Sequence, residues 1–75
     1  MNLASRQEYY FERRGNTSCT KGDTINDKAT CRKACDYLKL SKRSIVGGNV
    51  CYIDSRGNCY QDGWNGSGAS FICKN

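Results

Sequence analysis

Residues 31–38 of the chain read CRKACDYL. The less polar side chains of this run are spaced i, i+3, i+4 and i+7: Cys31, Ala34, Cys35 and Leu38. This spacing places them on one face of an α-helix, with charged residues on the opposite face. Asn26 or Asp27 can cap the N-terminus of such a helix. The pattern therefore predicts an amphipathic helix over residues 27–40.

A β-hairpin is predicted further along the chain, where two short runs flank the sequence DSRGN at residues 54–58. An Asp that opens a type I turn, with Gly three residues later, suits a three-residue hairpin loop. This turn pairs Ile53 with Cys59 and Tyr52 with Tyr60. Because side chains alternate along a strand, Ile53 and Cys59 then share one face and the tyrosines share the other.

The remaining segments complete the expected architecture. Residues 62–70 contain three glycines and predict a long loop, and residues 70–74 predict a third strand. Residues 19–25 read as a loop, and residues 9–11 (YYF) suit either a strand or a short helix. We therefore expect an α+β fold: a small disulfide-rich domain with one α-helix packed on a short three-stranded antiparallel sheet.

Disulfide bonds are expected to stabilise this domain. A chain of 75 residues with 37% hydrophobic residues has too small a core to be comfortably stable. Each disulfide contributes roughly 2–4 kcal/mol. Cys31 and Cys35 lie on the buried helix face, and we expect them to bond two of the three strand cysteines. Cys19 would then bond the remaining strand cysteine. The spacing does not choose among the possible pairings. The six cysteines are Cys19, Cys31, Cys35, Cys51, Cys59 and Cys73.

The cysteines also predict the compartment. The chain has no His and no Cys-x-x-Cys pair, so we expect no zinc site and no other metal or cofactor. Persistent disulfides form in oxidising compartments, which predicts a secreted, extracellular protein and, at this size, a monomer. No apolar run has the length of a signal peptide or a membrane span, so secretion is inferred from the cysteines alone.

The first 14 residues differ from the rest because they contain no cysteine and end in the dibasic pair Arg13-Arg14. One interpretation is a processing site for a kexin-type protease, which cuts after paired basic residues. Residues 1–14 would then be a pro-segment, or otherwise an N-terminal extension, in front of a six-cysteine domain over residues 15–75. The alternative is an ordinary solvated arginine pair.

The residue types argue against an enzyme. Without His, neither a Ser-His-Asp nor a Cys-His arrangement can form. Oxidised cysteines leave no thiolate nucleophile. A pair of carboxylates could act on a glycosidic bond, but a domain this small would struggle to enclose the sugar. Residues 62–68 lack the spaced ligands of a calcium loop. We therefore expect no catalytic residues.

Positive charge is concentrated on the predicted helix. The net charge of the chain is +5. Residues 21–43 carry seven Lys and Arg against three Asp, whereas residues 44–75 carry two of each sign. Such a surface would attract an anionic membrane, nucleic acid or an acidic protein, or it serves only solubility. This candidate basic face consists of Lys28, Arg32, Lys33, Lys39, Lys42 and Arg43.

A second candidate surface is aromatic. Tyr52, Tyr60 and Trp64 could form a platform for sugar rings or for a partner's anchoring side chain. Alternatively, they cover the outer face of a thin sheet, or Trp64 packs into the core. Two N-glycosylation sequons begin at Asn16 and Asn65, both in predicted loops, and fit a secreted glycoprotein.

Two resemblances follow from these motifs. The Cys31-x-x-x-Cys35 helix next to a hairpin resembles the cysteine-stabilised αβ proteins, which include insect and plant defensins and scorpion toxins. The cysteine-free start that ends in Arg13-Arg14, before a six-cysteine core, resembles small secreted effectors of fungal pathogens. Residues 3–6 (LASR) are similar to a Leu/Ile-x-Ala-Arg element in the pro-segments of such effectors.

These observations lead to one main functional hypothesis and two alternatives. The main hypothesis is a cationic effector or toxin-like virulence protein that binds a target in another organism. The first alternative is a defensin-like antimicrobial protein that acts on anionic membranes. The second is a carbohydrate-binding module. The expected partner is accordingly an extracellular or host protein, an anionic membrane surface or a glycan.

Overall fold

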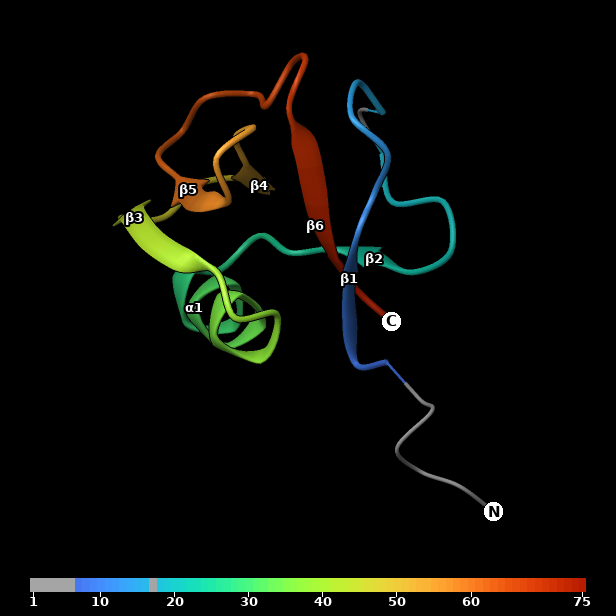
Figure 1. The fold of residues 1–75 in the computed structure, drawn as a ribbon, viewed down its shortest axis with the longest axis horizontal. Coiled ribbons are helices and arrows are strands. Elements are labelled where there is room, and N and C mark those ends of the chain that lie inside the picture. The colour runs from blue at the N-terminus through green and yellow to red at the C-terminus, as the bar shows by residue number, and fades with distance from the viewer. Residues whose placement is uncertain (1–6, 17) are drawn as a thin grey trace.

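The computed structural model describes residues 7–16 and 18–75. These residues form one helix and a six-stranded sheet, with strands in the order β1-β6-β4-β5-β3 and with β2 also paired to β6 (Figure 1). The elements in chain order are β1 (Tyr9–Phe11), β2 (Asp23–Thr24), α1 (Lys28–Tyr37), β3 (Ser41–Ile45), β4 (Cys51–Ile53), β5 (Asn58–Gln61) and β6 (Ser70–Lys74).

Helix α1 forms where the sequence pattern predicts it, and it is shorter at both ends. Asp27 is the N-cap, and its side chain accepts a hydrogen bond of 2.9 Å from the backbone N–H of Thr30. The helix ends at Tyr37 with Leu38 as its C-cap, because Lys39 adopts a positive φ of 61° that turns the chain out of the helix. Its buried side chains belong to the predicted apolar face.

The predicted hairpin is confirmed. Strands β4 and β5 are antiparallel, with Tyr52 opposite Tyr60 and Ile53 opposite Cys59. In the turn, the backbone N–H of Gly57 donates to the carbonyl of Asp54, and Gly57 has a φ of +82°, a conformation that favours glycine. The third predicted strand, β6, pairs antiparallel with β4.

The sheet is larger and more mixed than expected, so the prediction of three antiparallel strands is wrong in this respect. Strand β3 pairs with β5 in parallel, and its burial pattern is mostly exposed, which is why no strand pattern marks it in the sequence. Strand β2 is only two residues long and lies in the segment expected to be a loop. Strand β6 pairs with three strands: β1, β2 and β4.

The N-terminal segment contributes to this sheet. Strand β1 resolves the ambiguity of residues 9–11 and runs antiparallel to β6. The pairing continues beyond the strand, because the N–H of Glu12 donates to the carbonyl of Phe71 and the N–H of Asn75 donates to that of Glu8, both at 2.8 Å. Residues 1–14, predicted to be a pro-segment or an extension, thus include a strand of the folded domain; their removal by a protease remains a prediction.

The core lies between α1 and one face of the sheet. It contains the disulfides Cys31–Cys51 and Cys35–Cys59, which join the helix to β4 and β5. The third disulfide, Cys19–Cys73, attaches the loop before β2 to β6. The prediction that the helix cysteines bond two strand cysteines and leave Cys19 for the third is confirmed. The buried residues of this cluster are Tyr9, Ile25, Cys31, Ala34, Cys35, Ile45, Cys51, Ile53, Cys59 and Ile72.

A second, smaller cluster lies on the opposite face of the sheet. Its buried members are Tyr52, Phe71 and Cys73, and the partly buried residues packed against them are Tyr10, Cys19, Val50, Tyr60 and Ala69. Gly66 of the loop between β5 and β6 has a φ of +74°, and a Cβ built there would lie 2.6 Å from the ring of Phe71. The backbone of this loop therefore lies directly on the aromatic ring. Three disulfides in so small an α+β domain are typical of extracellular proteins.

Candidate functional site

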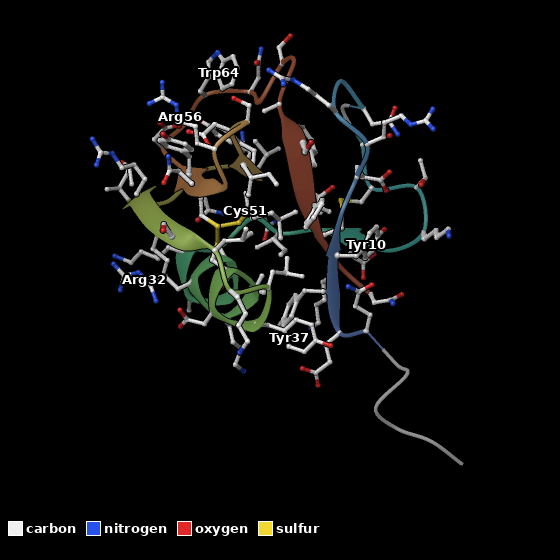
Figure 2. All side chains as sticks on the ribbon, in the orientation of Figure 1. Tyr10, Arg32, Tyr37, Cys51, Arg56 and Trp64 are labelled. Atoms are coloured by element: carbon white, nitrogen blue, oxygen red, sulfur yellow. A yellow bond between two sulfur atoms is a disulfide. The ribbon has the colours of Figure 1, made fainter. Side chains whose placement is uncertain are left out.

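The predicted basic residues lie on more than one surface. Lys28, Arg32 and Lys33 are exposed on α1, and Lys39 follows its end. Figure 2 shows Arg32 at the helix end of the molecule, away from Arg56 and Trp64. The helix and the far face of the sheet therefore present separate candidate surfaces.

Lys42 and Arg43 have different neighbours, and the register of β3 against β5 shifts between Lys42 and Ser44, so that Arg43 lies at a β-bulge. Lys42 forms an ion pair with Asp36 of α1 and so lies on the helix side. Arg43 lies close enough to Tyr60 to act on the ionisation of its phenol. Lys42 thus belongs to the helix surface, and Arg43 belongs to the aromatic surface.

The structure brings the three predicted aromatic residues together. The rings of Tyr52 and Tyr60 are stacked, with centroids 5.3 Å apart and planes at 15°. Trp64 meets Tyr52 edge to face at 5.2 Å and 68°. Tyr52 is only 6% exposed and belongs to the core, whereas Trp64 is 49% exposed. The accessible aromatic surface therefore belongs mainly to Trp64 and Tyr60.

Two carboxylates hold the tyrosines in place. The hydroxyl of Tyr52 donates to Asp62 and that of Tyr60 donates to Asp54, each at 2.9 Å. Burial, followed by the bond to Asp62, raises the pKa of Tyr52 well above its usual value. For Tyr60, the hydrogen bond to Asp54 is the largest of the causes that raise its pKa. Both phenols are therefore neutral hydrogen-bond donors at physiological pH.

Asp54 itself is held in its ionised form. It accepts hydrogen bonds from the backbone N–H groups of Arg56 and Asn58, from the Asn58 side chain and from Tyr60. The bond from the Asn58 N–H is the largest cause that lowers the pKa of Asp54 far below its usual value. The sequence predicts Asp54 only as a turn residue; its contact with Tyr60 depends on the register of the hairpin.

Arginines surround this aromatic surface from three parts of the chain. Arg43 of β3 and Arg56 of the hairpin turn lie near Tyr60, where their charges act to lower the pKa of its phenol. Arg14 lines the same depression as Trp64, and its Nε donates to the carbonyl of Gly68 at 3.4 Å. We call these three arginines, together with Tyr60 and Trp64, the aromatic–arginine surface. Sequence reasoning missed the contribution of Arg14 and Arg56.

Two open depressions occur on the surface of the described residues. The smaller, about 300 Å³, lies beside Trp64 and is lined by Arg14, Tyr52, Ile53, Asp54, Ser55, Trp64, Ser67, Gly68, Ala69 and Ser70. The larger, about 500 Å³, lies between β1, α1 and the end of β6 and is lined by Gln7, Glu8, Tyr9, Lys33, Tyr37, Lys74 and Asn75. The smaller depression is part of the aromatic–arginine surface, because Arg14 and Trp64 line it.

The other predicted site residues are exposed. Arg13 and Arg14 lie at a tight turn, in which the N–H of Asn16 donates to the carbonyl of Arg13 at 3.0 Å. The side chain of Asn16 also donates to Glu12, whose pKa is lowered mainly by a hydrogen bond from the Thr20 N–H. Asn65 lies in the loop before β6. Thr17 of the first sequon lies outside the described residues, and glycosylation at either sequon remains a prediction.

The six cysteines are all oxidised in the structure. The sulfur atoms of Cys31, Cys35 and Cys51 lie within 4.8 Å of one another. Their proximity results from two neighbouring disulfides, and a disulfide sulfur does not provide the thiolate that binds a metal.

Comparison with known proteins adds no family to this description. No family model, curated protein or solved structure matches the chain. Within the described part of the chain, the single helix falls short of the length and apolar character needed to cross a membrane.

Proposed function

We propose that this chain is a secreted, disulfide-stabilised protein that acts by binding a target in another organism, as effectors and toxins do. The observation that carries the proposal is the aromatic–arginine surface. There the half-exposed Trp64 lies on the same face as Tyr60, and three arginines from separate segments surround them. Trp, Tyr and Arg are the residue types that contribute most to binding energy at interfaces.

The scaffold beneath this surface favours binding. Two disulfides fix α1 to β4 and β5, and the hydroxyls of Tyr52 and Tyr60 are bonded to Asp62 and Asp54. Side chains held in this way lose little conformational entropy when a ligand binds. A protein exposed to extracellular proteases also benefits from covalent cross-links.

The structure gives less support to a membrane-disrupting protein. A helix that inserts into a lipid surface needs an accessible apolar face. The apolar face of α1 consists of Cys31, Ala34 and Cys35, which are buried against the sheet, and two of these residues are bonded to it. The helix therefore offers mainly its charged side to a membrane.

The test measures binding of the full, oxidised, fluorescently labelled chain to intact plant, insect and mammalian cells. We expect saturable binding to one of these, competed by unlabelled protein. The double variant Trp64→Ala/Arg56→Ala should weaken binding at least about tenfold, the loss expected when interface hot spots are truncated. The matched control is Phe11→Ala/Arg32→Ala, because Phe11 is also half-exposed and Arg32 lies on the helix surface.

Two results would overturn the proposal. One is the absence of saturable binding to any of the three cell types. The other is leakage of a dye from anionic phospholipid vesicles at the concentrations used for cell binding, which would support the antimicrobial alternative instead. If the control variant lost as much binding as the test variant, the aromatic–arginine surface would not be the site.

A further inference from the structure

The depression beside Trp64 has the composition of a sugar subsite. We propose that it binds one pyranose ring of a neutral glycan, with Trp64 under the ring and with Arg14, Asp54 and three serines around its rim. This inference rests on the binding role proposed above and specifies the chemistry of the target. Figure 2 shows Trp64 at the edge of the molecule, where it is open to a ligand.

Trp64 provides the surface for the ring. Its indole is held by the edge-to-face contact with Tyr52, while 49% of the residue remains exposed. A pyranose has an apolar face of C–H groups, which packs on an aromatic ring, and a rim of hydroxyl groups. The hydrogen bond from the Trp64 backbone N–H to Asp62 helps to hold the residue in position.

The rim of the depression matches hydroxyl groups. Ser55, Ser67 and Ser70 line it, and each serine hydroxyl can both donate and accept a hydrogen bond, as a sugar hydroxyl does. Arg14 can only donate, and ionised Asp54 already accepts hydrogen bonds from Arg56, Asn58 and Tyr60, so Asp54 contributes its negative charge to the lining. A few polar groups placed around an apolar surface are typical of small-molecule sites.

The charges in the depression favour a neutral ligand. Arg14 contributes one positive charge and Asp54 one negative charge to the lining. The hydrogen bonds to Asp54 keep it ionised, so the two charges balance. A carboxylate or phosphate would be attracted by Arg14 and repelled by Asp54, whereas a neutral polyol can accept a hydrogen bond from Arg14 without that repulsion.

The size and openness of the depression limit the contact to a short piece of glycan. A volume of about 300 Å³ is at the lower end of the range for ligand sites. Because the depression is open, a longer chain can continue into solvent from the bound ring. Affinity for a single site of this kind is expected to be weak, with a Kd of about 1 mM.

The test uses NMR titration of the full, oxidised chain with trisaccharides of glucose, N-acetylglucosamine, mannose and xylose, each up to about 10 mM. We expect at least one to shift the amide signals of Arg14, Ser55, Trp64 and residues 67–70. Signals around the larger depression, such as that of Tyr37, should not move. The chain has a single Trp, so fluorescence from Trp64 provides an independent binding curve.

Variants then test the assigned roles. Trp64→Ala should weaken binding at least about tenfold, and Arg14→Ala about threefold. Arg13→Ala is the matched control for Arg14, because it removes the same charge from the neighbouring exposed residue, which does not line the depression. If Trp64→Ala disturbs the fold, Trp64→Phe and the shift map of the unaltered chain still test the site.

Several outcomes would overturn the inference. They are no binding of any neutral trisaccharide, shifts that map to another surface, or equal losses in Arg13→Ala and Arg14→Ala. Tighter binding of trigalacturonate than of every neutral sugar would show that the ligand is anionic. If the chain binds cells but no glycan, only this inference fails; if it binds neither, the proposed function fails as well.

Discussion

The two faces of the sheet are stabilised in different ways. On the helix side, two disulfides cross a cluster of ten buried residues and bond α1 to β4 and β5. On the far side, three buried residues, a single disulfide and two tyrosine–aspartate hydrogen bonds hold the segment before β2, the hairpin turn and the loop after β5. The helix side thus provides most of the covalent and apolar stabilisation.

This difference suggests a division of roles between the faces. The helix side buries most of its apolar residues, although Tyr37 of α1 is 40% exposed, and the half-exposed Trp64 lies on the far side. Loops tolerate substitution better than core elements and commonly carry binding residues. If the roles are divided in this way, the far face can be altered without unfolding the helix side.

The largest effect is expected from removing both disulfides of the helix side. Each closes a segment of 20 or 24 residues, which corresponds to about 3 kcal/mol. Together they exceed the roughly 3–5 kcal/mol that a core of this size supplies. Replacing all four of their cysteines, Cys31, Cys35, Cys51 and Cys59, by Ala should abolish cooperative unfolding in a urea titration followed by circular dichroism.

The matched control removes the disulfide of the far face. Cys19→Ala/Cys73→Ala opens a segment of 54 residues and should cost about 4 kcal/mol, but the domain should remain folded. If this variant were unfolded while the variant without the helix-side disulfides still melted cooperatively, the assignment of the stabilising face would be reversed.

A smaller effect is expected at the loop that covers Phe71. A Cβ at Gly66 would lie 2.6 Å from the ring, and the positive φ is unfavourable for Ala, so Gly66→Ala should cost about 2–3 kcal/mol. Gly68 also has a positive φ, but a Cβ there would have nothing within 4 Å, so Gly68→Ala should cost only about 1 kcal/mol. Equal losses in chemical denaturation would show that the loop does not pack on Phe71.

Acid should weaken the far face through Asp54. Because folding lowers the pKa of this carboxyl, its contribution to stability is complete above the ordinary value of 3.8 and is lost as the pH falls below that value. Asp54→Asn should therefore reduce the drop in unfolding midpoint between pH 7 and pH 3. Asp23→Asn, at an exposed position of β2, is the control and should leave that drop unchanged. An unaltered drop in Asp54→Asn would contradict the prediction.

The smallest effect is expected for the ion pair between Asp36 and Lys42. Both side chains are largely exposed, at 62% and 41%, and pairs of this kind contribute less than about 1 kcal/mol. Lys42→Ala should change the free energy of unfolding by less than about 0.5 kcal/mol. A larger loss would mean that β3 depends on this contact to stay next to α1.

Much of the helix side could be predicted from the sequence, because its signals are local or covalent. The spacing of Cys31, Ala34 and Cys35 identifies the buried face of α1, and the DSRGN turn fixes the register that pairs Tyr52 with Tyr60. Because Cys31 and Cys35 lie on this buried face, strand cysteines are their expected partners. The predicted partition of the disulfides follows from these local features.

The rest of the sheet could not be predicted, because its strands depend on distant partners. The exposed, charged residues of β3 show no alternation, and its parallel pairing with β5 is visible only in three dimensions. Likewise, Tyr9 is buried only because β1 lies beside β6. The aromatic part of the candidate site was predicted, but Arg14 joins it through the same long-range pairing.

The position of β6 has a consequence for the order of folding during synthesis. Translation releases the chain from its N-terminus at about 5–20 residues per second, and β6 is the last of the described elements to emerge. Strands β1, β2 and β4 lack their shared partner until then. The four cysteines of the helix and the hairpin can form their disulfides before Cys73, the partner of Cys19, has been synthesised. The arrival of residues 70–74 thus joins the described strands into one sheet and provides the partner of Cys19 at the same time.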